Sequence, residues 1–262
     1  MAMNHNLPAA VRETVSYASD QKAVREGGNL WCNYLIRTTI LVSFAFMIVP
    51  LTDITVSGWF VDATGNFNLH DNQYLLALRD LHRTLPAIIV PALLFALVMQ
   101  ALFNRRYLPA PHKLLYILSV YAIGAAAIVH GLKYLVGRAR PNEIMEFGGN
   151  LLFSPAWQIA NSCQRSCSFP SGESASAMAM LTIPLVLSGF YRLPLLVLTM
   201  VAVLIFSLNR IVMGAHFLSD VILSWLFVAI VMAWLWPVFQ RHALQIDRSV
   251  VRIGKRIRSS RF

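Results

Sequence analysis

A basic, an imidazole and an acidic side chain begin an apolar stretch late in the chain. They are Arg210, His216 and Asp220, within the segment Asn-Arg-Ile-Val-Met-Gly-Ala-His-Phe-Leu-Ser-Asp. Because His216 and Asp220 are four residues apart, they would share one face of a helix, where the carboxylate can orient a nucleophilic imidazole. Arg210 supplies a planar clamp for an oxyanion, preferably a phosphate. Structurally, the pair could instead cap a membrane helix while Arg210 snorkels to the membrane boundary.

A second cluster follows an apolar stretch in the middle of the chain. Lys133 and Arg140 are seven residues apart and would share a face of a continuous helix, but Pro141 indicates that the helix stops there. His130, one turn before Lys133, is a further polar group at this point. Snorkelling is the structural alternative, and for Lys133 taken alone it is the better one.

A third cluster begins the next apolar stretch, with the sequence Phe-Pro-Ser-Gly-Glu-Ser. Ser171 is a suitable N-cap, which places the amides of Gly172 and Glu173 in the first turn of a helix, where free N–H groups and the helix dipole favour an anion. This arrangement predicts a phosphate cradle. The alternative is an ordinary helix start at which Glu173 compensates the dipole.

The composition predicts that these polar groups belong to a membrane protein. Hydrophobic residues make up 57% of the chain and charged residues 13%, well below the roughly 25% charged residues of soluble domains. The mean hydropathy is +0.58. We therefore expect an all-α polytopic membrane protein with about six transmembrane helices. The predicted spans cover about residues 38–56, 84–103, 114–136, 175–190, 193–208 and 217–239.

The basic residues predict the orientation. The formal charge of +10 comes mainly from short connections and the tail, without the basic and aromatic interleaving of a nucleic-acid surface, so no nucleic-acid partner is expected. The positive-inside rule places the loop at residues 104–113 and both termini in the cytoplasm, and the three polar clusters on the opposite side. We expect a cytoplasmic segment 1–37, either a surface helix or disordered, a six-helix domain 38–240, and a basic tail 241–262. The tail either touches anionic headgroups or only holds the orientation.

Four charged or polar residues end the loop before the second predicted span. They are Arg79, Asp80, His82 and Arg83. They either line the entrance of a site or form a solvated helix end, and a solvated helix end is the more common arrangement.

Two cysteines lie in the long loop before the third cluster. By alternation of the spans, Cys163 and Cys167 face away from the cytoplasm, where disulfides persist, so we expect them to pair, whereas Cys32 stays free. Two thiols without further partners fall short of a zinc site, and no metal is expected.

The first two motifs resemble those of the type 2 phosphatidic acid phosphatase superfamily, which also includes bacterial acid phosphatases and vanadium haloperoxidases. Its first motif, Lys, six residues, Arg-Pro, is matched by residues 133–141. Its second, Pro-Ser-Gly-His, is matched by residues 170–172 but ends in Glu173 instead of histidine.

The third motif of that superfamily is Ser-Arg, five residues, His, three residues, Asp. Arg210, His216 and Asp220 match it, with Asn209 in the serine position. The resemblance covers residues 133–220, and the six-helix layout extends it over most of the chain.

The resemblance implies hydrolysis of a phosphomonoester or pyrophosphate through a covalent phosphohistidine, without a metal or other cofactor. His216 would attack phosphorus, and Asp220 would orient its ring. The transferring oxygens would be bound by five residues: Lys133, Arg140, Ser171, Gly172 and Arg210.

The glutamate at position 173 is a departure, because the histidine of the family motif resembles a general acid for the leaving oxygen. Three readings stay open: Glu173 is the acid, His130 replaces it, or the leaving group needs little help. An apolar site and a phosphate would raise the pKa of Glu173, whereas nearby cations would lower it. With a glutamate at this position, the motif also resembles that of some lipid A phosphatases of Gram-negative envelopes.

The expected substrate is a membrane lipid phosphate, because its apolar part stays in the bilayer. The resemblance implies a bacterial inner-membrane enzyme with a periplasmic site and lipid A as the first candidate. Undecaprenyl pyrophosphate, phosphatidate and phosphatidylglycerol phosphate follow. A lipid-to-lipid phosphotransferase and a non-catalytic lipid-phosphate binding protein are the alternatives, and a haloperoxidase is the least favoured.

Overall fold

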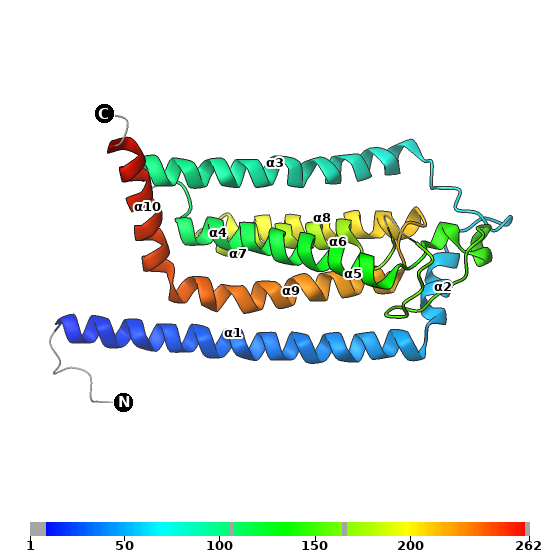
Figure 1. The fold of residues 1–262 in the computed structure, drawn as a ribbon, viewed down its shortest axis with the longest axis horizontal. Coiled ribbons are helices and arrows are strands. Elements are labelled where there is room, and N and C mark those ends of the chain that lie inside the picture. The colour runs from blue at the N-terminus through cyan, green and yellow to red at the C-terminus, as the bar shows by residue number, and fades with distance from the viewer. Residues whose placement is uncertain (1–8, 105–106, 164–166, 260–262) are drawn as a thin grey trace.

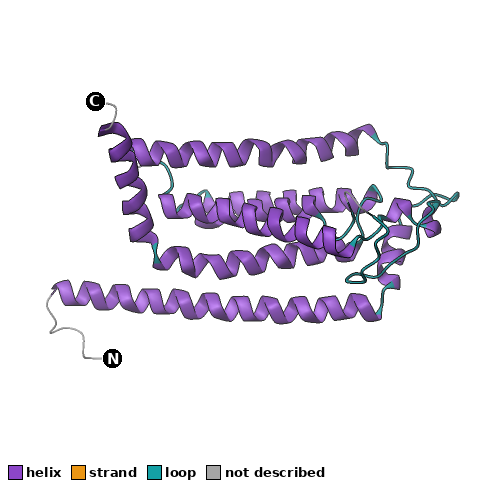
Figure 2. Cartoon of the chain, viewed as in Figure 1, coloured by secondary structure: helices purple, strands orange, loops and turns teal. Residues whose placement is uncertain are grey.

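The computed structural model describes residues 9–104, 107–163 and 167–259, with side chains from Glu26 onward. Over these residues the chain is almost entirely helical and contains no strand (Figure 2). This confirms the all-α prediction. Arg105 and Arg106, on which the predicted orientation partly depended, lie outside the described residues, as does the end of the tail at 260–262.

The molecule is an elongated bundle of roughly parallel helical rods (Figure 1). One rod is continuous through an α-helix, a π-helix and a second α-helix. In the middle of the bundle a shorter rod of two helices packs against α8 (Arg192–Val212), α9 (Leu218–Arg241) and η1 (Tyr121–Ile128). The elements of the bundle are α1 (Ala9–Ile48), α3 (Gln73–Phe103), α4 (Pro111–Val120), η1 (Tyr121–Ile128), α5 (Val129–Val136), α6 (Gly172–Met180), α7 (Thr182–Val186), α8 (Arg192–Val212) and α9 (Leu218–Arg241).

Five helical segments of the described chain are long and apolar enough to cross a membrane, where about six were expected. They are Glu26–Ile48, Gln73–Phe103, Pro111–Glu143, Arg192–Val212 and Leu218–Arg241.

The predicted span at residues 175–190 is not a single long helix in the structure. It is divided into α6 and α7, and no helix continues through residues 187–190. Pro184 explains the break, because proline cannot donate to the carbonyl one turn earlier and its ring crowds that carbonyl. The Thr182 hydroxyl donates to the Ala179 carbonyl at the break, over 2.6 Å.

Two predicted spans begin earlier in the structure than expected. The first membrane segment starts at Glu26 and ends at Ile48, so part of the expected N-terminal segment 1–37 belongs to it. The chain then turns into the short helix α2 (Leu51–Gly58). α3 begins at Gln73, capped by the Asn72 side chain, and so carries the residues before position 84 into the bundle.

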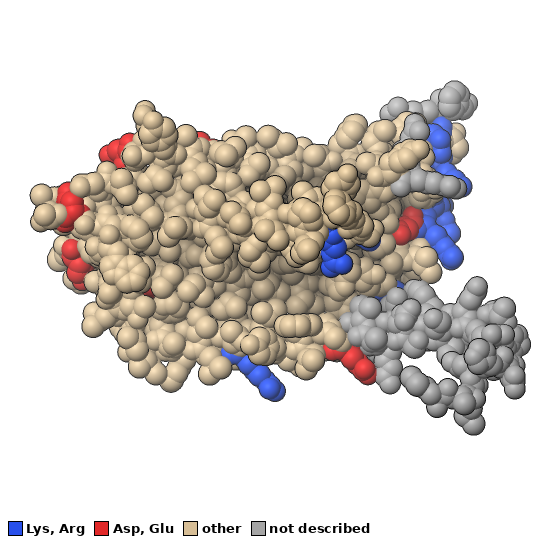
Figure 3. Space-filling view, turned by 180° about the vertical axis from the view of Figure 1, so that it is seen from behind, with Lys and Arg blue, Asp and Glu red and all other residues tan. Residues whose placement is uncertain are grey.

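The interior of the bundle is closely packed around η1, α6 and α9. Gly124 of η1 is buried, and a Cβ there would lie 3.4 Å from Val228 of α9. The lack of a side chain at Gly124 therefore allows a close approach of the two helices. On the face shown in Figure 3, most charged side chains lie toward the two ends of the molecule.

The two ends of the bundle are different. One end carries α2, the loops and the N-termini of α6 and α9 (Figure 1). The other end carries the start of α1 and a final helix, α10 (Ala243–Ser259), which crosses the ends of the rods. Both ends of the described chain therefore lie at the same end of the bundle.

Candidate active site

The three polar clusters meet at the end of the bundle that carries α2. Lys133 is in the last turn of α5, Arg210 in the last turn of α8, and Asp220 in the first turn of α9. Glu173 is in the first turn of α6. Lys133 and Asp220 are 87 positions apart in the chain. They are brought together because these helix ends lie at the same end of the molecule.

A sharp turn between α8 and α9 positions His216. The backbone N–H of His216 donates to the Arg210 carbonyl over 3.2 Å. Gly214 has φ +65°, and a Cβ there would lie 2.6 Å from the ring of Phe67. Only glycine combines this backbone conformation with so close an approach. The turn holds the imidazole beside the end of α8, close to Arg210.

His216 precedes α9 and does not share a helical face with Asp220, contrary to the expectation. The two side chains still face each other, with Nδ1 of His216 and Oδ2 of Asp220 3.6 Å apart. Burial, helped by the positive charges of Lys133 and Arg210, lowers the pKa of His216 to about 4, although Asp220 acts in the opposite direction. The imidazole is therefore neutral at neutral pH, as a nucleophile must be.

Asp220 is held by groups on several segments. It accepts hydrogen bonds from the Phe217 backbone N–H over 2.9 Å and from the Ser168 hydroxyl. Nη1 of Arg138 donates to its Oδ1 over 2.6 Å. The carboxylate is thus fixed while one oxygen faces His216.

Arg138 is itself part of a fully buried ion network. Its Nη2 donates to Oδ2 of Asp53 in α2 over 2.9 Å, and both side chains are 0% exposed. The guanidinium also lies 4.1 Å from the centre of the Phe217 ring. The Ser219 backbone N–H donates to Oδ1 of Asp53 over 2.9 Å. One arginine therefore links two carboxylates, Asp53 and Asp220.

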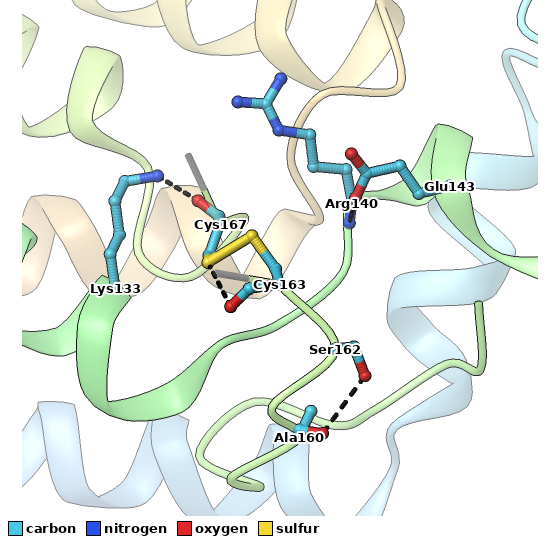
Figure 4. The surroundings of a disulfide bond; sticks show 7 residues. All are labelled: Lys133, Arg140, Glu143, Ala160, Ser162, Cys163 and Cys167. Atoms are coloured by element: carbon cyan, nitrogen blue, oxygen red, sulfur yellow. Dashed lines mark hydrogen bonds between the residues drawn. A yellow bond between two sulfur atoms is a disulfide. The ribbon is translucent and has the colours of Figure 1, made fainter. Parts of the chain in front are cut away.

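α5 ends before Arg140, so a turn and not a helical face relates Lys133 to Arg140. Gly137 ends the helix with φ +60°, and its N–H donates to the Lys133 carbonyl. The Lys133 ammonium donates to the Cys167 carbonyl. In Figure 4 the Lys133 ammonium and the Arg140 guanidinium extend to the same side of the disulfide. Arg140 also acts electrostatically on both Lys133 and Arg210.

The disulfide joins Cys163 and Cys167 (Figure 4). Because Lys133 binds the carbonyl of Cys167, the bridged loop sits directly against one of the expected phosphate-binding residues. Cys32 is unpaired.

Ser171 caps α6, as expected. Its hydroxyl accepts from the Ser174 backbone N–H over 3.3 Å, and its own N–H donates to the Asp220 carbonyl over 3.2 Å. A Cβ at Gly172 would lie 3.4 Å from Val129 and 4.0 Å from Cε of Lys133. The start of α6 thus lies beside both Lys133 and Asp220.

Glu173 pairs with two arginines. Its Oε2 pairs with Nε of Arg210, and its Oε1 accepts from Nε of Arg83 over 2.6 Å. Burial alone would raise the pKa of Glu173, but the positive charges of Arg210 and Arg83 outweigh it and lower that pKa. Without substrate, Glu173 is therefore ionised, and its carboxylate pairs with Arg210, which is expected to bind phosphate.

Arg83 shows that the polar residues before position 84 do not form only a solvated helix end. Arg83 reaches Glu173, and His82 is buried against the Phe206 ring, with its Nε2 3.3 Å from the Ser176 hydroxyl. His130 lies elsewhere: it is an exposed residue of α5. None of the described contacts joins it to the other site residues, so the structure does not support it as the acid.

Two further site residues, Asp53 and Arg138, were not recognised in the sequence. Arg83 was named there only as one of four residues that either line a site entrance or form a solvated helix end. A signal existed for Asp53, because a carboxylate inside an apolar segment is a functional suspect. Arg138 lay within the first motif cluster, but nothing local indicated a partner 82 or 85 residues away. Among the described residues, no group of three or more His, Cys, Asp or Glu is placed to hold a metal ion.

Known proteins resemble this chain in sequence. A protein of Rhizobium leguminosarum named "Lipid A 4'-phosphatase" is 33% identical over 179 residues, which cover 64% of this chain and 74% of the relative. A protein of the same name from Rhizobium etli is 32% identical, covering 64% and 67%. One from Francisella tularensis subsp. novicida is 25% identical, covering 71% and 85%.

The fold also resembles a solved structure. The transmembrane PAP2 type phosphatidylglycerolphosphate phosphatase from Bacillus subtilis superposes with a TM-score of 0.53 at 18% identity, covering 80% of this chain and 96% of that one. Residues 113–244, just over half of the chain, match the PAP2 superfamily. The motif resemblance is confirmed, and the chain belongs to the PAP2 superfamily.

Proposed function

We propose that this protein removes a phosphate from lipid A at the periplasmic face of a bacterial inner membrane. As a member of the PAP2 superfamily with membrane-spanning helices, the chain is a membrane lipid phosphatase. The lipid A assignment is supported by three relatives that carry the name "Lipid A 4'-phosphatase". The observation that carries the proposed reaction is the neutral, buried His216 facing Asp220 among three cations.

In the proposed first step, Nε2 of His216 attacks phosphorus. A P–N bond forms, the P–O bond to the sugar breaks, and the leaving oxygen takes a proton. Asp220, fixed by Arg138, compensates the positive charge that develops on the imidazole. In the second step, water attacks phosphorus, the P–N bond breaks, and inorganic phosphate leaves.

The cations neutralise charge on the transferring oxygens, the main task in phosphoryl transfer. Lys133, Arg140 and Arg210 lie within electrostatic range of one another. The N-terminus of α6, with Ser171 and Gly172, lies beside Lys133. It adds backbone N–H groups and the positive end of the helix dipole, both of which favour an anion.

Glu173 is the proposed general acid, and its ion pairs suggest how it acquires a proton. A phosphate that binds Arg210 competes with the Glu173 carboxylate for the same guanidinium. Once displaced, Glu173 faces a negative phosphate instead of Arg210, and both changes raise its pKa. The protonated carboxyl can then donate to the leaving oxygen. Arg83 keeps the side chain at the site during this exchange.

The test is phosphate release by the purified protein from lipid A, undecaprenyl pyrophosphate, phosphatidate and phosphatidylglycerol phosphate. Wild type is compared with Glu173→Gln and Glu173→His. We expect release from lipid A, its loss in Glu173→Gln and its retention in Glu173→His. Phosphate release only from one of the other lipids would overturn the assignment of lipid A as the substrate. Lipid A binding without release would favour the transferase or binding alternatives, and an added acceptor lipid separates those two.

A further inference from the structure

The helix at the end opposite the active site, α10, is held firmly across the bundle. It packs against α3 and α4 (Figure 1). A Cβ at Gly254 would lie 1.9 Å from the Ala101 carbonyl oxygen, so the two backbones touch. Asp247 accepts from the His112 backbone N–H over 2.9 Å, and its second oxygen lies 2.9 Å from Nδ1 of His112. α10 is therefore part of the folded protein and not a loose tail.

A basic pocket lies between α10 and the end of α3. Arg248, Arg252 and Lys255 line it, together with Val251, Asn104 and Asp247. Asp247 is already engaged by His112. Among the described residues, no carboxylate forms an ion pair with the three cations, which are all exposed. The pocket therefore offers three positive charges to an anion from outside the chain.

The same helix exposes apolar side chains. Ile253 and Ile257 are 57% and 46% exposed. They are four residues apart, so they lie on one face of α10. Exposure of two isoleucines to water is unfavourable, whereas burial at the boundary of the acyl chains would remove them from it. Basic side chains gather at this end of the molecule (Figure 3).

From these observations we propose that α10 lies in the headgroup layer of the leaflet opposite the active site, and that its basic pocket binds the phosphate of an anionic phospholipid. The three cations complement the headgroup phosphate, and the exposed isoleucines, on another face of α10, would anchor the helix at the acyl-chain boundary of the leaflet. A soluble phosphate would satisfy only the cations. This binding site goes beyond the proposed phosphatase function and does not depend on it.

The test compares phosphatidylglycerol, phosphatidylcholine with the same acyl chains, and inorganic phosphate, each added to the purified full-length protein in detergent. Bound lipid is counted by native mass spectrometry, and the thermal midpoint is followed in parallel. We expect phosphatidylglycerol to bind and raise the midpoint at low salt, and the other two to have little effect. Equal responses to both lipids, or an inorganic-phosphate response that equals that of phosphatidylglycerol, would overturn the proposal.

A matched pair of variants localises the site. Arg252→Gln with Lys255→Gln removes two charges from the pocket, and Arg256→Gln with Arg258→Gln removes two charges from α10 outside it. The first pair should weaken phosphatidylglycerol binding by about thirtyfold, and the second should retain most of it. Equal weakening by both pairs would contradict a pocket site. An unchanged thermal midpoint in the absence of added lipid shows that each variant is folded.

Discussion

His216 depends on residues that lie behind it. Asp220 faces the imidazole, Arg138 binds Asp220, and Asp53 binds Arg138, so three buried charged groups form one chain of contacts. A buried ion pair contributes little net stability when complete, but the loss of one partner leaves an uncompensated charge. Asp53 should therefore act as a positioning residue for the reactive pair.

Asp53→Ala is expected to lower both stability and turnover. Removal of one partner from a buried ion pair costs about 3–5 kcal/mol, which should appear as a lower thermal midpoint of the purified protein. Asp53→Asn retains an acceptor for the Ser219 N–H and should recover part of the turnover.

Asp80→Ala is the matched control for Asp53→Ala, because the Asp80 side chain is 61% exposed. Its change in stability should stay within about 0.5 kcal/mol. Wild-type turnover in a well-folded Asp53→Ala variant would exclude the positioning role.

The protonation of His216 predicts the pH dependence of kcat/KM for the free enzyme. The imidazole attacks only when neutral, and burial lowers its pKa to about 4. Activity limited by His216 should therefore persist below pH 6.5, the ordinary value for histidine, and fall only as the pH drops through about 4. Full recovery of activity after return to neutral pH excludes unfolding as the cause. A fall centred near pH 6.5 would show that burial does not govern this histidine.

Helix ends position the site. α5, α6, α8 and α9 each end or begin at the active-site end of the bundle, and the turn between α8 and α9 is the tightest of these connections. Its shape depends on the positive φ of Gly214 and on the contact with Phe67.

Gly214→Ala should reduce stability and phosphate release together. The methyl group would meet the Phe67 ring at 2.6 Å in addition to the strain of a positive φ. Gly189 is the matched control, since its φ is +93° and nothing lies within 4 Å of an added Cβ. Gly189→Ala should therefore show only the backbone strain, about 1 kcal/mol. Phe67→Ala should partly restore Gly214→Ala, and equal effects of the two alanine variants would exclude the contact with Phe67.

At the level of elements, the sequence predicted most of the helices and the place where the three motifs meet. Apolar length was sufficient to predict α3, α8 and α9, which are three of the five candidate membrane spans. It was misleading for residues 175–190, because Pro184 divides a segment that is otherwise apolar enough to span. The early start of α3 was missed because charged and polar residues interrupt the apolar pattern before position 84, and two of them, Arg83 and His82, contribute to the site.

The missed side-chain partners have a common cause. Arg83 and Glu173 are 90 residues apart in the chain, and Asp53 and Arg138 are 85 apart. Local spacing reports residues on the same helix, and it carries no information about which distant helices become neighbours. The prediction that His216 and Asp220 share a helical face was wrong because the helix was expected to include His216, whereas α9 begins at Leu218.

On the face shown in Figure 3, most charged side chains lie toward the two ends of the molecule. The site, α2 and the disulfide lie at one end, and α10 with both ends of the described chain lies at the other (Figure 1). Candidate membrane spans connect the two ends. If the site faces the periplasm, the disulfide must face it as well, whereas α10 must face the cytoplasm.

Thiol labelling in a Cys32→Ser background tests this orientation. A membrane-impermeant maleimide should leave intact spheroplasts unlabelled at Cys163 and Cys167, because the two are paired. After mild reduction, label should enter from the outer face of spheroplasts and not from the outer face of inverted vesicles. Labelling without reduction would refute the disulfide, and labelling only in inverted vesicles would reverse the topology.

The central claim is that His216 carries the phosphoryl group during turnover, and its most direct measurement is a rapid alkaline quench of the protein with phosphate-labelled lipid A. Phosphohistidine survives alkali, so peptide mapping can locate the label. The account predicts label on His216 in wild type, and none in His216→Ala, which should still bind the lipid. Turnover without label on His216, or label that persists in His216→Ala, would contradict it.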